Sequence, residues 1–175
     1  MEEFDPVFFC LVLPCMMLCA LAPIAAILGY AIWQSRRRRA DQENLQNRLG
    51  SLTPDEQIFA VKYASQARFK QILKIFPWNE WGVFRLGPAG GIFYRLGPAG
   101  DNSDRPVQEL PFPAATTSVQ PVKRDFLRNS ALSWVVLENE GSTHYFTVET
   151  GATIFGSRQK AEQMRTAFSQ HFREA

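Results

Sequence analysis

The chain has 175 residues and a formal net charge of +2, which is long enough for one domain with its own core beside a further segment. Residues 1–35 carry −3 and the arginine run at 36–39 carries +4, which leaves +1 for residues 40–175 and gives no reason to expect a nucleic-acid surface. All three cysteines, Cys10, Cys15 and Cys19, lie near the N-terminus, which excludes a disulfide framework and a cysteine zinc site from the rest of the chain.

The first predicted element is a membrane-spanning helix over residues 6–33. Residues 6–35 contain no charged side chain, and a helix of about 20 apolar residues crosses the hydrocarbon core of a bilayer. The flank rich in Lys and Arg faces the cytoplasm. We therefore expect a single-pass protein of the inner (cytoplasmic) membrane, with residues 1–5 as a short extracytoplasmic tail and the chain after Arg39 in the cytoplasm. A cleaved secretory signal and a buried core helix are the alternatives, and the acidic start and the length of the apolar run disfavour them.

The run Arg36, Arg37, Arg38 and Arg39 lies where anionic lipid headgroups would be, each worth about 1 kcal/mol of surface attraction. We predict a membrane-surface contact there. The alternative is that the run only fixes the topology of the helix.

Small residues recur on one face of this helix at steps of three and four. They are Cys15, Cys19, Ala22, Ala26 and Gly29. Small side chains let a second helix approach closely in a membrane, so we predict that this face packs against an integral-membrane protein partner. Chance recurrence of alanine is the alternative. Further ligands near Cys15 and Cys19 are missing from the sequence, so no cofactor is expected there.

Residues 34–50 form a basic juxtamembrane segment and linker, in which the helix should continue until Gly50 stops it. Thr53, Pro54 and Glu56 then form a capping box, which predicts a short helical turn. Residues 57–67 fit either a longer helix or a strand, and we favour a strand.

A duplication of period ten follows, with FRLGPAG at 84–90 and YRLGPAG at 94–100. It predicts strands at 83–86 and 92–96 with turns at the Gly-Pro pairs. A phosphate-binding loop would need a helix directly after the glycines, and none is expected. Further strands are predicted at 107–112, 116–122, 133–138 and 143–149, the last two as a hairpin, and an amphipathic helix at 158–173.

The motifs at 52–56 and 109–112, the hairpin at 133–148 and the helix at 158–172 resemble those of bacterial pleckstrin-homology-like (PH-like) domains. The resemblance covers about residues 51–175, which we take as a cytoplasmic β-rich domain. It implies a binding role and an α+β fold, in which the membrane helix precedes a mainly antiparallel β sandwich or barrel closed by the C-terminal helix. The sequence departs from this pattern in the duplicated segment and at 78–81.

No catalytic or metal-binding pattern occurs in the domain, so we expect neither an enzyme nor a cofactor or metal. His144 should face solvent, and neither it nor His171 has a carboxylate or nucleophile partner in sequence. Trp78 and Trp81 are of the residue type that anchors interfaces, although core packing explains them equally well.

We therefore expect a non-catalytic, single-span accessory or scaffold subunit whose helix packs into a larger integral-membrane complex and whose β-domain braces it. The layout is like that of the H-type subunit of reaction centres. The alternative is a free membrane-anchored PH-like module that binds a ligand or a protein in signalling or envelope stress.

Overall fold

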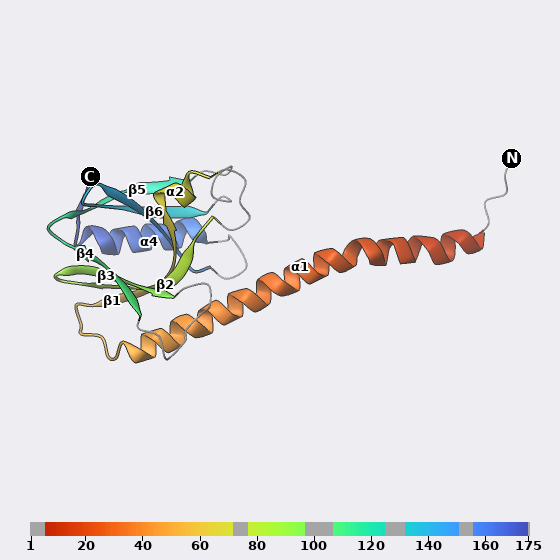
Figure 1. Ribbon diagram of the computed structural model, residues 1–175, viewed down its shortest axis with the longest axis horizontal. Helices are drawn as coiled ribbons and strands as arrows, with labels where there is room; N and C mark the ends of the chain where they lie inside the picture. The colour runs from red at the N-terminus through yellow and green to blue at the C-terminus, as the bar shows by residue number, and fades with distance from the viewer. Residues whose placement is uncertain (1–5, 72–76, 97–106, 125–131, 151–155, 175) are drawn as a thin grey trace.

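The computed structural model describes residues 6–71, 77–96, 107–124, 132–150 and 156–174 (Figure 1). In the first helix, side chains are described from Leu21 onward, together with those of Met16 and Cys19. The elements are α1 (Pro6–Arg48), β1 (Gln57–Ser65), α2 (Gln66–Phe69), β2 (Glu80–Gly87), β3 (Gly90–Leu96), β4 (Gln108–Pro113), β5 (Thr117–Arg124), β6 (Ser133–Asn139), β7 (Ser142–Val148), α4 (Ser157–Ser169) and β8 (Arg173–Glu174).

The eight described strands form one sheet in the order β4-β3-β2-β1-β7-β6-β5-β8. All neighbours are antiparallel except β5 and β8, which are parallel. The pairing of β1 with β7 joins the first four strands to the last three long ones. Six of the seven pairings are antiparallel, and the short parallel pairing of β5 with β8, which was not predicted, makes this single sheet mixed. The α+β class is as expected.

The inner face of the sheet and α4 enclose the main core. Phe84, Phe93, Phe112, Phe146 and Phe168 are fully buried there. Phe168 of α4 packs its ring 4.6 Å from that of Phe84. The amphipathic helix predicted at 158–173 is α4, which ends earlier, at Ser169. Its apolar residues Ala161, Met164, Ala167 and Phe168 are buried, as is Phe172 just beyond its end.

Several local predictions hold. Residues 57–65 are a strand, and the Thr53–Glu56 capping contacts close a turn in which the Thr53 N–H donates to Glu56 Oε2 at 2.9 Å. The first GPAG is the turn between β2 and β3, where Gly90 has a φ of +124°. The turn of the second copy lies outside the described residues. α1 ends at Arg48, and Gly50 has a φ of +81°, as expected for a glycine stop.

The predicted membrane-spanning helix at 6–33 is wrong. Within the described part of the chain, no helix combines the length and the apolar character that a membrane span needs. The described side chains from Leu21 to Trp33 are 13 apolar residues, fewer than the about 20 that a span needs, and Gln34, Ser35 and four arginines follow them. The expected orientation and the expected location in the cytoplasmic membrane depended on that span, and both stay predictions.

Candidate functional site

The C-terminal third of α1 is part of the β-domain rather than a linker. Ser35, Arg38, Gln42 and Leu45 are buried against it, and Leu49 is half-buried. Leu45 packs with four residues of β2 and β3 on the outer face of the sheet, namely Trp81, Val83, Tyr94 and Leu96. Figure 1 shows the rest of α1 extending away from the domain.

A buried charged cluster fixes α1 to the sheet. Glu149, which follows β7, accepts from Lys62 Nζ of β1 at 2.9 Å and from Arg38 Nε of α1 at 3.4 Å. All three side chains are at most 5% exposed. Trp78 contacts both cations, with its ring centroid 4.4 Å from Lys62 Nζ and 5.6 Å from Arg38 Cζ. Burial lowers the pKa of Lys62, and the carboxylate of Glu149 opposes that shift.

Gln42 makes the second polar attachment. Its Nε2 donates to the carbonyl of Val61 at 3.2 Å and to that of Gly82 at 3.0 Å. These two residues face each other across β1 and β2. One side chain of α1 therefore bonds both strands, and a shift of α1 along the sheet would break both hydrogen bonds at once.

The remainder of α1 makes a sharp contrast with this attachment. Every side chain from Leu21 to Tyr30 is exposed, and none is charged. Of the large hydrophobic side chains that are exposed in the described residues, only Leu52 lies outside this helix: the others are Met16, Leu21, Ile24, Ile27, Leu28, Tyr30, Ile32 and Trp33. Such a surface marks an interaction site when it is contiguous.

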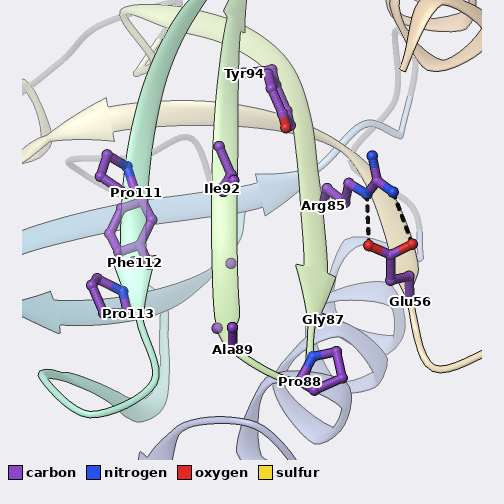
Figure 2. Close-up of a pocket in the computed structure, with 12 residues that line it drawn as sticks. Glu56, Arg85, Gly87, Pro88, Ala89, Ile92, Tyr94, Pro111, Phe112 and Pro113 are labelled. Carbon is purple, nitrogen blue, oxygen red and sulfur yellow. Dashed lines mark hydrogen bonds and ion pairs between the residues drawn. The ribbon is translucent and has the colours of Figure 1, made fainter. Parts of the chain in front are cut away.

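A hollow of about 400 Å³ lies on the domain, at the β2–β3 turn. Figure 2 shows the Glu56–Arg85 pair on one side, Ile92 and Tyr94 of β3 between, and three residues of β4 on the other side, Pro111, Phe112 and Pro113. Arg85 donates to both carboxylate oxygens of Glu56, at 3.0 and 2.8 Å. This pair holds the pKa of Glu56 down to about 2.

The strand β4 lies at the end of the sheet, and it carries two prolines opposite Ile92 and Gly90. Proline has no N–H to donate, so this edge is a poor template for an added strand. The hollow therefore suits an inserted side chain or a small apolar molecule better than strand addition.

The prediction that His144 faces solvent is wrong. It is half-buried on the inner face, where its Nδ1 lies 3.1 Å from the hydroxyl of Tyr63. Burial, and secondarily the charge of Arg95, lower the pKa of His144. Arg95 in turn lies over the ring of Tyr63 and pairs with Glu80 at 3.4 Å. Among the described residues, no three His, Cys, Asp or Glu side chains are grouped as metal ligands.

The predicted site residues are scattered over these features. Of the arginine run, Arg38 is in the buried cluster, and its three neighbours are exposed. Cys19, Ala22, Ala26 and Gly29 are exposed on the projecting part of α1, and the side chain of Cys15 lies outside the described set. Trp81 is buried under Leu45, whereas Trp78 is half-buried beside Lys62.

Lys62, Glu149 and Gln42 were missed as contact residues by the sequence reasoning. A signal was present in the spacing of 35, 38, 42, 45 and 49, which is the 3–4 step of one helix face.

Comparisons with protein-family models, curated proteins and solved structures give no match.

Proposed function

We propose that this protein is a non-catalytic accessory subunit of a larger assembly. The exposed part of α1, from Leu21 to Trp33, is enclosed by apolar helices of a partner, and the β-domain braces the assembly from one end. The observation that supports this most is that residues 21–30 are exposed and uncharged on every side of the helix. A helix that is apolar all round is stable only when it is enclosed.

The attachment of α1 supports the bracing role. The buried cluster at Glu149 and the two hydrogen bonds of Gln42 fix the helix on the sheet at several points. A partner that holds the N-terminal half of α1 therefore also holds the β-domain at a set angle.

The test is purification of the full chain in mild detergent, at its native expression level, with quantitative mass spectrometry. We expect a stoichiometric partner, which the charge introduced by Ile27→Glu should remove. Asn44→Glu is the matched control, because Asn44 is exposed on the same helix beyond the apolar part. A chain that purifies alone, or a partner that tolerates Ile27→Glu, contradicts the proposal.

A second candidate function is that of a PH-like module that binds a ligand or a protein, which the hollow at the β2–β3 turn favours. Gly87 lies in its wall, and a Cβ there would come 3.4 Å from Glu56 Cγ. Gly87→Val should fill part of the hollow. Ligand-observed NMR with a library of apolar fragments should show binding that this variant loses and that Ser142→Val, on an exposed strand position, retains.

A further inference from the structure

The face of α1 that docks on the β-domain has a regular spacing. Its contact residues are Ser35, Arg38, Gln42, Leu45 and Leu49. The steps between them are 3, 4, 3 and 4, which is the spacing of a helix seam that packs against one neighbour.

The same steps continue toward the N-terminus and reach Ala31, Leu28, Ile24 and Leu21. A straight helix drifts only about 20° per seven residues from this repeat, so these side chains stay on nearly the same face. All four are apolar; Ala31 is half-buried, and the other three are exposed. We call this row of residues at 3–4 spacing the seam. It is polar at Arg38 and Gln42, where the domain covers it. It is apolar from Leu21 to Leu28, where no described residue covers it.

The β-domain lies on one side of α1, and the N-terminal half of the helix runs on beyond it (Figure 1). A partner on the seam face would meet the helix and the adjoining end of the domain together. A partner on the opposite face, where the small residues Ala22 and Ala26 lie, would meet the helix alone. Contact with both surfaces buries more area and adds a second set of interactions.

We propose that the seam of Leu21, Ile24 and Leu28 is the primary partner face of α1, and that its occupant is an apolar α-helix of the partner that abuts the β-domain beside Trp78. The occupant is a helix because side chains at 3–4 spacing insert between those of a facing helix. It carries no charge at the contact, because the seam offers none to pair with. This inference rests on the proposed function and specifies the face and the chemistry of its partner.

The experiment places a photo-crosslinking amino acid at single positions of the full chain in its native cells. The seam positions are Ile24 and Leu28, the opposite-face positions are Ala22 and Ala26, and Asn79 reports on the exposed end of the domain beside Trp78. We expect Ile24, Leu28 and Asn79 to crosslink to one and the same helix of the partner, and Ala22 and Ala26, which other helices of the partner enclose, to give no adduct with that helix. The crosslinked peptide should show apolar residues at 3–4 spacing.

A matched pair of double variants gives a second readout. Ile24→Ala with Leu28→Ala should weaken retention of the partner by at least about tenfold, whereas Ala22→Leu with Ala26→Leu should retain it. Adducts from Ala22 and Ala26 alone would overturn the inference and leave the proposed function standing. Adducts between two copies of this chain would replace the partner by self-association and so overturn it as well. Adducts from no position on α1 would overturn both.

Discussion

Glu149 is the carboxylate on which the attachment of α1 depends. It is shared by two buried cations, Lys62 at 2.9 Å and Arg38 at 3.4 Å. Removing one member of a buried ion pair leaves an uncompensated charge, which costs more than the pair itself contributes. We therefore expect Glu149→Gln to lower the free energy of unfolding by about 3–5 kcal/mol.

The measurement is urea unfolding followed by tryptophan fluorescence, with Glu162→Gln as the control because Glu162 is exposed on α4. If both variants unfolded at the same urea concentration, the buried cluster would not contribute to the stability of the fold.

The lowered pKa of Glu56 predicts that the stability of the domain depends on pH. The guanidinium of Arg85, followed by the backbone and side chain of Thr53, lowers the pKa of Glu56 from 4.5 to about 2. A carboxyl whose pKa is lower in the folded state contributes stability above its unfolded pKa, and that contribution is lost as the pH falls toward the folded value. Between pH 4.5 and 2, the wild type should therefore lose more stability than Glu56→Gln does. Thermal unfolding of both proteins across this range tests the difference, and parallel curves would contradict it.

Gly82 in β2 is a position with no room for a side chain. A Cβ there would collide with the carbonyl of Tyr94 and the ring of Phe93, whereas one at Gly87 would make only a close contact with Glu56. We expect Gly82→Ala to destabilise the domain by about 1–3 kcal/mol, as for other overpacked sites, and Gly87→Ala to be mild. Equal unfolding midpoints for the two variants would show that the strand can relax around the added methyl group.

Equivalent residues of the duplicated segment lie on opposite faces of the sheet. Phe84 and Tyr94 are equivalent in the repeat, but their strands are antiparallel, with Phe84 facing Phe93 and Tyr94 facing Val83. Phe84 therefore lies in the inner core, while Tyr94 lies on the outer face under Leu45. The repeat predicted the strands and the first turn correctly, because these depend on local residues.

Long-range contacts could not be predicted in this way. Arg38 and Glu149 are 111 positions apart, and Arg38 in a run of four arginines looks like surface charge. Gln42 bonds to two backbone carbonyls, which leave no trace in the residue types of β1 and β2. The helix α4 was predictable, apart from its C-terminal end, because its buried face is made of apolar residues alone, whereas the stripe at 35–49 mixes Ser, Arg and Gln with two leucines.

These contacts move the boundary of the folded unit. A cut at residue 50 would remove the cover from an apolar patch on β2 and β3 that includes Trp81 and Tyr94, and would take Arg38 away from Glu149. A cut at residue 33 keeps the entire docked part of α1. The predicted division into a linker at 34–50 and a domain from 51 thus passes through a packed interface.

We therefore expect the fragment 34–175 to be folded and monomeric, and the fragment 51–175 to aggregate or to unfold at a lower temperature. The physical reason is twofold, because the shorter fragment exposes the apolar patch and leaves Lys62 with less compensation for its burial. Light scattering together with thermal unfolding would measure both effects, and adding the peptide 34–50 in trans should partly restore the shorter fragment. If the two fragments behaved alike and the peptide had no effect, α1 would not be a structural part of the domain. Partner contacts on the exposed part of α1 could then not fix the orientation of the sheet.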